Sequence, residues 1–428
     1  MVTATTVLIV FFALLLLGVP IAYVVLGAAA VGILGNGYSP ALLAQQTFAG
    51  ANSFVMLSVP FFIISGDIAS KGKTASKIVD VINAFFGRVP GGLGIATIAA
   101  CAFFGAITGS AIATIVAIGA LMLPKLIEAG YPKLLALGII TCGGTLGVMI
   151  PPSIPMLLVS VALQTSVSAS FAAGFIPGIL TAALMCLWIF FYAKKNKIGG
   201  SEKLSFREKM TTVKNSIWAL LYPVIVLGSI YSGIATPTEA AVISVFYVFI
   251  VEVFVYRKFS FQEIYATLRT STVNAATMTI FVATAQVLLY YVTKEKIPDR
   301  VITLLTANVN SAGAMMAILC FIFLVAGCFT NVGAFVVILS PILLAILSQY
   351  DISVTNFVIV CTLMNQIGFI TPPFGLCLFV TMKIAGASVI EVVRGSIPFM
   401  IAMAVATILV IMFPGIALFL PRLLGFTV

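Results

Sequence analysis

The sequence predicts an all-α polytopic membrane protein with two inverted-topology repeats, each containing a re-entrant helical hairpin and a broken transmembrane helix. Composition is the first reason: 62% of the 428 residues are hydrophobic and 8% are charged, with a mean hydropathy of +1.23. A soluble domain carries about a quarter charged residues. The second reason is a series of apolar runs long enough to cross a bilayer. The third is that a Pro-Pro pair interrupts a long apolar run twice, at Pro151-Pro152 and at Pro372-Pro373.

The apolar runs alternate with short polar connectors. The first run, residues 5–34, has neither the basic segment nor the small-residue cleavage site of a secretory signal, so we expect a retained first span. The other runs lie at residues 48–69, 92–108, 110–127, 134–168, 172–193, 214–233, 236–256, 270–293, 311–329, 331–348, 355–385 and 396–421.

Basic residues gather in the connectors. The segment from Lys194 to Lys214 holds seven Lys or Arg residues and two Glu residues, so the Lys/Arg rule places it in the cytoplasm. Residues 71–90 form a second cytoplasmic segment, which we expect to be partly an amphipathic interfacial helix. The net charge of +10 reflects this loop bias, and we expect no nucleic-acid partner.

The topology follows if both basic segments are cytoplasmic. Residues 92–127 then form a hairpin that returns to its own side, while the interrupted run 134–168 and the run 172–193 are two crossings. One extra span between the repeats reverses the second repeat. The expected parts are a first repeat, 1–193 (scaffold helices 1–90, hairpin and broken helix 91–170, closing span 171–193), a basic loop, 194–214, an extra span, 215–233, and a second repeat, 234–428 (scaffold helices 234–293, hairpin and broken helix 311–385, closing span 396–421).

The internal repeat is visible as one constant shift. Pro372 lies 221 positions after Pro151, and the same shift without gaps aligns both break points and their flanks. It also pairs Ser110 with Asn331. Such repeats are typical of secondary transporters, whose sites lie near the midplane where discontinuous helices meet. The identities at this shift are Thr141 with Thr362, Gly147 with Gly368, Pro151 with Pro372, Pro152 with Pro373, Gly174 with Gly395, and Pro177 with Pro398.

The breaks offer oxygen ligands for a cation. Glycine lets the backbone turn at a hairpin tip, Thr and Ser add hydroxyls, and proline frees carbonyls one turn earlier. Unwound carbonyls and hydroxyls suit a hard monovalent cation such as sodium. The expected first sodium site comprises Thr108, Gly109, Ser110, Gly143, Gly144, Gly147, Ile150 and Pro151. The second comprises Thr330, Asn331, Gly333, Gly368, Thr371 and Pro372. Substrate-binding candidates are Thr145, Pro152, Ser153 and Pro373.

Packing is the alternative interpretation of each residue alone. Small residues let transmembrane helices approach closely, and a proline can merely kink a helix. The Ser153 hydroxyl could equally bond back to its own helix. A binding site is favoured only because each hairpin's small polar residues are paired with a Pro-Pro break and this combination occurs in both repeats.

Several chemistries are excluded or disfavoured. The chain has no His, which removes Ser/His/Asp triads, and none of its seven Cys residues forms a CxxC motif, so we expect no metal other than sodium and no cofactor. It has no GxxxxGK[ST] motif and is not itself an ATPase. Glu239 follows Thr236-Pro237-Thr238 and suits a helix cap better than a proton relay. Sodium coupling is therefore favoured over proton coupling.

Joint motifs resemble the large membrane subunit of tripartite ATP-independent periplasmic (TRAP) transporters. They are TGSAIATIVAIGALMLPKLIEAGYP, LGVMIPPSIPMLL, FAAGFIPGIL, YSGIATPTEAA (Tyr231–Ala241), CFTNVGAFVVILSPILL and GFITPPFGLCLF. The resemblance covers nearly the whole chain, and the motif CFTNVGAF is most similar to the sialic-acid branch of the family. The sequence departs from many members at Asn331, where they carry an acidic residue.

The resemblance implies a multi-pass protein of a bacterial inner membrane. Its implied partners are a small four-helix TRAP membrane subunit and a soluble periplasmic substrate-binding protein. The implied activity is sodium-coupled uptake of an organic acid, with sialic acid and C4-dicarboxylates both open, by an elevator movement as in the ion transporter superfamily. A stand-alone sodium/dicarboxylate-type symporter or exchanger, a passive channel and a scaffold for an enzyme are the alternatives.

Overall fold

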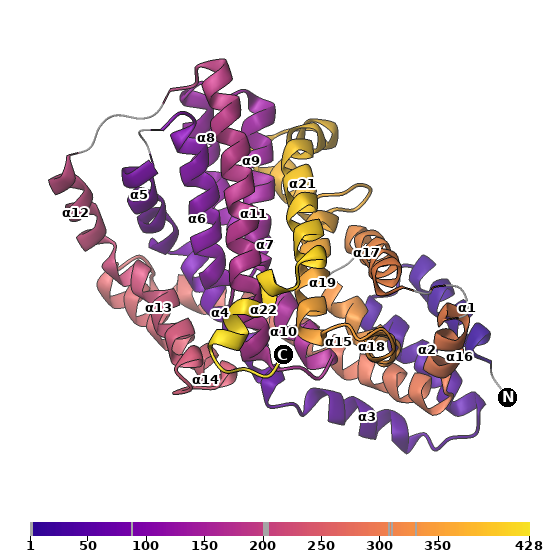
Figure 1. The fold of residues 1–428 in the computed structure, drawn as a ribbon. Helices are drawn as coiled ribbons and strands as arrows, with labels where there is room; N and C mark the ends of the chain where they lie inside the picture. Colours follow the sequence, from indigo (N-terminus) through magenta and orange to yellow (C-terminus); the bar gives the residue numbers. More distant parts are fainter. Residues whose placement is uncertain (1–2, 87–88, 200–204, 307–308, 310, 330–331) are drawn as a thin grey trace.

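The chain is built from helices. The computed structural model describes residues 3–86, 89–199, 205–306, 309, 311–329 and 332–428, and no strand occurs among them (Figure 1). In the first half the helices are α1 (Ala4–Leu16), α2 (Ile21–Gly35), α3 (Ala41–Ala51), α4 (Ser58–Lys71), α5 (Thr74–Phe86), α6 (Gly92–Thr108), α7 (Ala111–Thr114), α8 (Ala120–Glu128), α9 (Lys133–Thr145), α10 (Ile154–Ala162) and α11 (Val167–Asn196).

The second half is also built from helices. Its helices are α12 (Phe206–Asn215), α13 (Ile217–Tyr231), α14 (Pro237–Ile250), α15 (Phe261–Lys294), α16 (Ile297–Thr306), α17 (Ala312–Phe329), α18 (Val332–Gln349), α19 (Val354–Gly368), α20 (Leu376–Ala385), α21 (Val389–Met412) and α22 (Gly415–Leu423).

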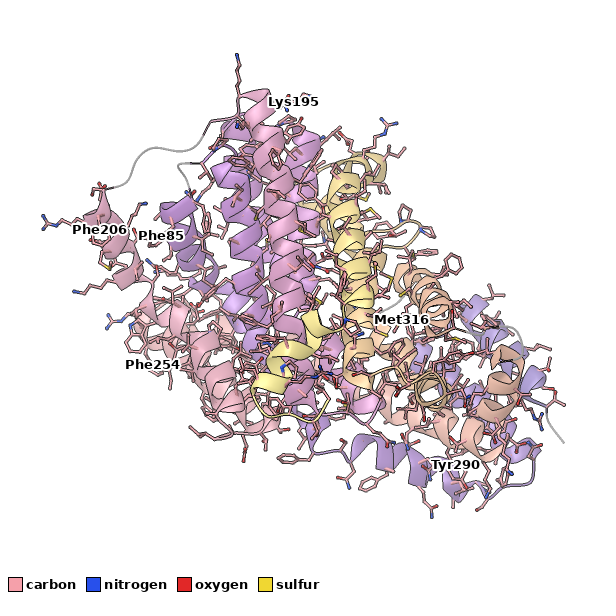
Figure 2. The ribbon with its side chains drawn as sticks, viewed as in Figure 1. Phe85, Lys195, Phe206, Phe254, Tyr290 and Met316 are labelled. Atoms are coloured by element: carbon pink, nitrogen blue, oxygen red, sulfur yellow. The ribbon has the colours of Figure 1, made fainter. Side chains whose placement is uncertain are left out.

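The protein is a multi-pass membrane protein by helix length and composition. Among the described residues, five helices are long and apolar enough to cross a membrane, or up to seven if each of two bent pairs is one span. One bent pair is α3 with residues 55–71 (63°), and the other is α12 with α13 (61°). Large apolar side chains are exposed on the outside, among them Phe85, Phe206 and Phe254 (Figure 2). These side chains suit contact with lipid.

The first apolar run is divided, which the sequence did not predict. Residues 5–34 form two helices, α1 and α2, rather than one span. Gly18 adopts a left-handed conformation with φ of +75°, and Pro20 precedes the first residue of α2. Glycine tolerates this conformation, and proline is favoured where a helix begins.

Both expected broken helices are present. α9 ends at Thr145, a 3-10 turn covers Leu146–Val148, and α10 begins only at Ile154. α19 ends at Gly368, and α20 begins at Leu376. The peptide bonds Pro151-Pro152 and Pro372-Pro373 are both cis. Proline supplies no amide donor to the preceding turn, so the helix cannot continue through either pair.

The element bounds follow the 221-residue shift. The shift carries residues 111–128, which form α7, a π-helical turn and α8, onto residues 332–349, the bounds of α18. It carries the first residue of α9 onto the first residue of α19. The turns before these two helices also correspond, because Gly130 and Asp351 both have a left-handed backbone, with φ of +81° and +52°.

The two repeats run in opposite directions. Lys133 at the start of α9 forms a 2.8 Å salt bridge with Glu391 at the start of α21, the helix that follows the second broken helix. Thr165, just after α10, lies 3.2 Å from Thr355 at the start of α19, measured between their Oγ1 atoms. The beginning of each broken helix therefore lies beside the end of the other, which makes the repeats inverted.

The broken helices and hairpins form the centre of the fold. Hairpin arm α6 packs on α9 and α17 packs on α19, within each repeat. The other arms cross between repeats, because α18 packs on α10 and the segment 111–119 packs on α20. Helices α2, α3, α4, α14 and α15 pack mainly on one another beside this core. The division into the expected residue ranges stays a prediction.

Candidate functional site

The tip of the first hairpin lies against the first break. Gly109 turns the chain between α6 and α7 with φ of +59°, and its carbonyl accepts a hydrogen bond from the Ile154 amide (3.3 Å). A Cβ atom at Gly109 would lie 2.7 Å from the Pro152 carbonyl oxygen. Both the left-handed turn and this close approach require glycine at the tip.

Three oxygen atoms cluster just behind the tip. The Thr114 hydroxyl donates to the Ser110 carbonyl (2.8 Å) and lies 3.1 Å from the Thr108 hydroxyl oxygen. The Thr108 hydroxyl also lies 3.3 Å from the Ser110 carbonyl oxygen. Thr108 and Thr114 are buried, with 2% and 0% exposed. Hydroxyl and carbonyl oxygens held together in this way can replace water around a hard cation.

The backbone of the break closes against this cluster at Gly147. A Cβ atom there would lie 2.6 Å from Thr114 Oγ1 and 2.7 Å from the Ser110 carbonyl oxygen. The Gly147 carbonyl has no amide donor four residues later, because residue 151 is proline. The structure thus brings together the expected residues Thr108, Gly109, Ser110 and Gly147.

Other expected residues have mainly packing contacts. Cβ atoms at Gly143 and Gly144 would lie 3.0 Å from Ile98 and 2.1 Å from Ile115, both in apolar side chains. The Thr145 hydroxyl donates to the Cys142 carbonyl (2.7 Å), within its own helix. The Ser153 hydroxyl donates to the Val148 carbonyl (2.5 Å) and accepts from the Met156 amide (3.3 Å), which caps α10. Their roles as ligands stay predictions.

The second break itself is described, but the tip of the second hairpin is not. Thr330 and Asn331 lie outside the described residues, so the second hairpin tip is not placed. Gly333 is buried in the first turn of α18, and a Cβ atom at Gly368 would lie 2.6 Å from the Gly327 Cα atom of α17. The Thr371 hydroxyl donates to the Ile367 carbonyl (2.8 Å), just before Pro372 and Pro373.

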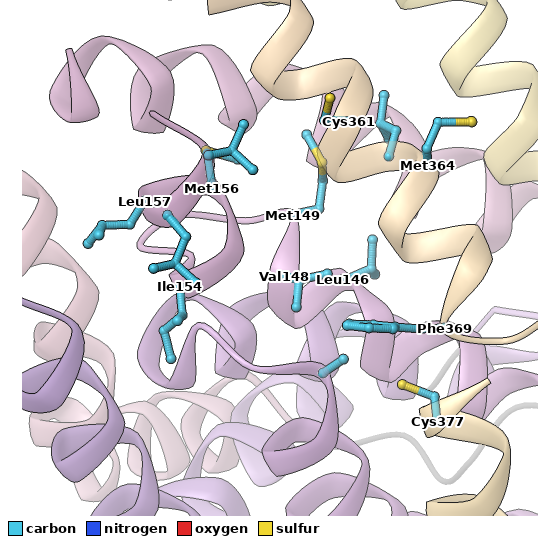
Figure 3. Packing of buried hydrophobic residues seen from close by; sticks show 14 of the residues in the cluster. Leu146, Val148, Met149, Ile154, Met156, Leu157, Cys361, Met364, Phe369 and Cys377 are labelled. Carbon is cyan, nitrogen blue, oxygen red and sulfur yellow. The ribbon is translucent and has the colours of Figure 1, made fainter. Parts of the chain in front are cut away.

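The same close packing occurs in both repeats. In the first, a Cβ atom at Gly105 of α6 would lie 2.6 Å from the Gly147 Cα atom. Gly147 and Gly368 correspond under the shift, so each break is crossed by the first arm of its own hairpin at a glycine pair. The two breaks also face each other, with Leu146 and Val148 of one beside Phe369 of the other (Figure 3).

Sequence reasoning missed two residues at these breaks. Thr114 lies four positions after Ser110, and this spacing could have placed it on the same helical face. Gln366 is 0% exposed, and neither polar atom of its amide has a hydrogen-bond partner among the described residues. Its counterpart under the shift is Thr145, whose hydroxyl is satisfied. A buried amide without partners costs stability and is retained where it has a ligand.

The two inverted repeats with paired helix breaks define a membrane transport protein of the secondary-transporter class. A family model described as "Tripartite ATP-independent periplasmic transporter, DctM component" matches residues 8–416. The chain belongs to this family. It is a transport protein and not an enzyme, since the relatives it matches are named as transporter permeases.

Named relatives match over nearly their full length. The chain is 34% identical over 383 residues to the C4-dicarboxylate TRAP transporter large permease protein DctM of Pseudomonas aeruginosa, covering 90% of each chain. It is 32% identical over 422 residues to the ectoine/5-hydroxyectoine large permease protein UehC of Ruegeria pomeroyi, covering 97% of this chain and 98% of the relative. It is 31% identical to the 2,3-diketo-L-gulonate large permease protein YiaN of Escherichia coli, covering 94% of each.

Solved structures share the fold. The Alcanivorax borkumensis YdaH transporter aligns with a TM-score of 0.60 at 13% identity, covering 88% of each chain. Neisseria gonorrhoeae MtrF aligns with a TM-score of 0.58 at 14% identity, covering 87% of this chain and 83% of that one. These identities are low, so the likeness concerns the architecture alone.

Proposed function

We propose that this chain is the membrane-embedded transport subunit of a sodium-coupled, binding-protein-dependent importer of organic acids in a bacterial inner membrane. The observation that carries the proposal is the pair of inverted helix breaks, one of which lies against an oxygen-lined hairpin tip. Sialic acid and C4-dicarboxylates are the proposed substrate classes. The name of the Pseudomonas aeruginosa relative supports the second class.

Sodium is the proposed coupling ion at the first break. The Ser110 carbonyl and the Thr108 and Thr114 hydroxyls supply neutral oxygens, and residues 146–153 supply unwound backbone beside them. Neutral oxygens suit a monovalent cation that must bind and then leave. The argument rests on the chemistry of these groups. The two hydroxyls are now hydrogen-bonded to each other or to the Ser110 carbonyl, and their oxygen atoms would face the ion when it binds.

The substrate is proposed to bind between the two breaks. An organic acid needs hydrogen-bond donors, and the unpartnered Gln366 amide has donor and acceptor atoms free to provide contacts. Thr145, Pro152, Ser153 and Pro373 remain proposed neighbours from their places at the breaks. Gln366 lies four residues after Thr362 on α19, which packs against α10 of the other repeat.

An elevator movement of the hairpins and broken helices against the scaffold is the proposed mechanism. Contacts that such a movement must break lie at the first hairpin tip. The Tyr222 hydroxyl of α13 donates to the Ile107 carbonyl (3.2 Å) and lies 2.6 Å from the Ser65 hydroxyl oxygen of α4. A Cβ atom at Gly66 of α4 would lie 2.9 Å from the Thr108 Cα atom.

The proposed partners are a small four-helix TRAP membrane subunit and a periplasmic binding protein. The isethionate permease DctMQ of Oleidesulfovibrio alaskensis is 35% identical to this chain, which covers 65% of that protein. The remaining third of that relative is long enough to contain a small membrane subunit fused to the large one in a single polypeptide.

The test is uptake into proteoliposomes that contain this chain with its small subunit and binding protein. We expect accumulation of the organic acid only when an inward sodium gradient is present. Uptake that is unchanged without the sodium gradient would contradict the coupling. Equal uptake without the binding protein would favour the stand-alone symporter instead.

A further inference from the structure

An apolar groove opens between helices that belong to different parts of the fold. It has a volume of about 660 Å³ and lies between α6 and α11 of the core and α13 beside the core. Its inner end reaches Ile150, one residue before the first proline pair. Small side chains on all three helices leave the space open. The lining includes Ala102, Ala106, Phe175, Ile179, Leu227 and Gly228.

One polar group lacks a partner in this groove. Tyr231, the last residue of α13, lines the groove, and its hydroxyl oxygen is buried without a hydrogen-bond partner among the described residues. A buried hydroxyl without a partner is unfavourable unless a ligand supplies one. An occupant that is apolar along most of its length and has an acceptor oxygen at one point would match both the lining and this hydroxyl.

The position of Tyr231 indicates where that oxygen lies. α13 begins next to the basic loop 194–214 and, with 15 residues, extends over about 22 Å. If the basic loop lies at the cytoplasmic surface, as its charge predicts, Tyr231 at the far end of α13 lies about 22 Å away in the direction of the opposite surface. Tyrosines are enriched at that level because the ring faces acyl chains while the hydroxyl meets lipid headgroups.

Other occupants fit poorly. An organic-acid substrate needs several donors for its carboxylate, and apolar side chains make up nearly all of this lining. A helix about 10 Å across fills roughly 400 Å³ in each 5.4 Å turn, so the groove would hold fewer than two turns of a partner helix. An acyl chain is narrower and matches the apolar lining.

We propose that a membrane phospholipid inserts an acyl chain between α13 and the pair α6 and α11, and that an ester or phosphate oxygen of the lipid accepts a hydrogen bond from Tyr231. The lipid fills a space that protein side chains leave between the core and α13. The groove contains none of the three oxygens of the cluster at the hairpin tip, although its inner end reaches Ile150, an expected sodium-site residue, and lipid occupancy can be measured without sodium coupling.

Gly228 provides a direct test, because a Cβ atom there would meet no heavy atom within 4 Å. Gly228→Leu should place its side chain in the groove without a clash and exclude the acyl chain. Gly313→Leu in α17 is the matched control: it is also a helical glycine with open space around it, and it does not line the groove. Tyr231→Phe keeps the ring and removes only the hydroxyl.

The measurement is the number of phospholipids retained per protein, determined by native mass spectrometry on the complex with its small subunit after extraction in mild detergent. We expect Gly228→Leu to lose about one phospholipid relative to wild type and to Gly313→Leu. Tyr231→Phe should release the same lipid at lower collision energy. Equal lipid retention in wild type and Gly228→Leu, both monodisperse, would overturn the proposal, as would unchanged release from Tyr231→Phe. The readout is lipid binding, so its outcome is independent of the proposed transport activity.

Discussion

The hydroxyl of Thr141 in α9 donates a 3.0 Å hydrogen bond to the hydroxyl oxygen of Thr381 in α20, and both residues are buried. The contact joins the first part of one broken helix to the second part of the other. Under the 221-residue shift the two positions correspond to Thr362 and Ser160, which are also buried hydroxyl residues. The breaks of the two repeats are therefore parts of one packed unit.

Removing this bond should cost stability. Thr141→Val keeps the side-chain shape but removes both the contact with the Thr381 hydroxyl and the hydrogen bond that the Thr141 hydroxyl donates to the Leu137 carbonyl of its own helix (2.7 Å). We expect the free energy of unfolding in detergent to fall by about 1 kcal/mol more than it does when only an own-helix bond is lost. The matched control is Thr362→Val, whose hydroxyl donates to the Val358 carbonyl of its own helix (2.8 Å). Equal losses in the two variants would contradict a special role for the cross-repeat bond.

The inverted arrangement predicts opposite labelling at equivalent positions. Glu128 and Gln349 end the second arms of the two hairpins, lie 221 positions apart and are exposed. In a variant whose native cysteines are replaced, Glu128→Cys should react with a membrane-impermeant maleimide only from the cytoplasmic side, and Gln349→Cys only from the periplasmic side. Labelling of both from one side would contradict the inversion.

The oxygen cluster predicts a change in sodium dependence. Thr114→Val removes a hydroxyl from the cluster without changing side-chain shape, so we expect half-saturating sodium for uptake to rise about tenfold, the equivalent of about 1.4 kcal/mol of binding. Ser110→Ala should also raise it, more weakly, since its carbonyl remains.

Thr181→Val is the control for these variants. Thr181 is fully buried, and its hydroxyl donates to a carbonyl four residues earlier (2.8 Å), as that of Thr114 does, but it lies in α11. Its sodium dependence should match wild type. An unchanged half-saturating sodium concentration in Thr114→Val would show that the cluster contributes to packing and not to sodium binding.

The unpartnered amide of Gln366 predicts opposite effects on stability and transport. Gln366→Leu has a similar volume and removes two buried polar atoms without partners, so the protein should gain about 1 kcal/mol or more of stability. Uptake should fall sharply if the amide contacts substrate. The measurements are thermal unfolding and the KM for uptake. A stabilised variant with unchanged uptake would show that Gln366 does not contact the substrate.

A buried carboxylate fixes the start of α5. Glu252, which is 0% exposed, accepts hydrogen bonds from the backbone amides of Lys73 (2.9 Å) and Thr74 (2.8 Å) and from the Thr74 hydroxyl (2.6 Å). Glu252→Ala leaves these donors without an acceptor, so we expect a loss of about 2 kcal/mol in unfolding free energy. Glu239→Gln, an exposed helix cap, is the control and should change the melting temperature much less. Equal changes would contradict the role of the buried carboxylate.

Features that depend on local chemistry could be predicted from the sequence. The Pro-Pro pairs predicted both breaks because proline has no amide hydrogen to donate. The helix cap at Glu239 is confirmed, since its carboxylate accepts from the Thr236 amide (2.8 Å) and its own amide donates to the Thr236 hydroxyl (3.3 Å). One constant shift predicted the repeat, because equivalent breaks retain the same residue types.

Features that depend on tertiary register could not be predicted. The spacing of Thr114 from Ser110 is local, but the sequence could not show that this cluster lies against Gly147, since that contact joins segments 33 positions apart. Gln366 differs from its counterpart Thr145, so the repeat gave no signal for it.

The division of residues 5–34 into α1 and α2 also matters for topology. It adds a helix before the first hairpin, and α1 then precedes α2 as α13 precedes α14.

The glycine pairs at the two breaks are alike, yet the repeats differ elsewhere in their packing. Gly138 of α9 meets Gly395 of α21 so closely that a Cβ atom would lie 2.0 Å from the Gly395 carbonyl oxygen, whereas its counterpart position is Ile359. One polypeptide thus holds two versions of the same unit with different residues at equivalent packing positions. The contact between α9 and α21 is therefore a place where the two halves of the core are held together differently, although one shift relates their sequences.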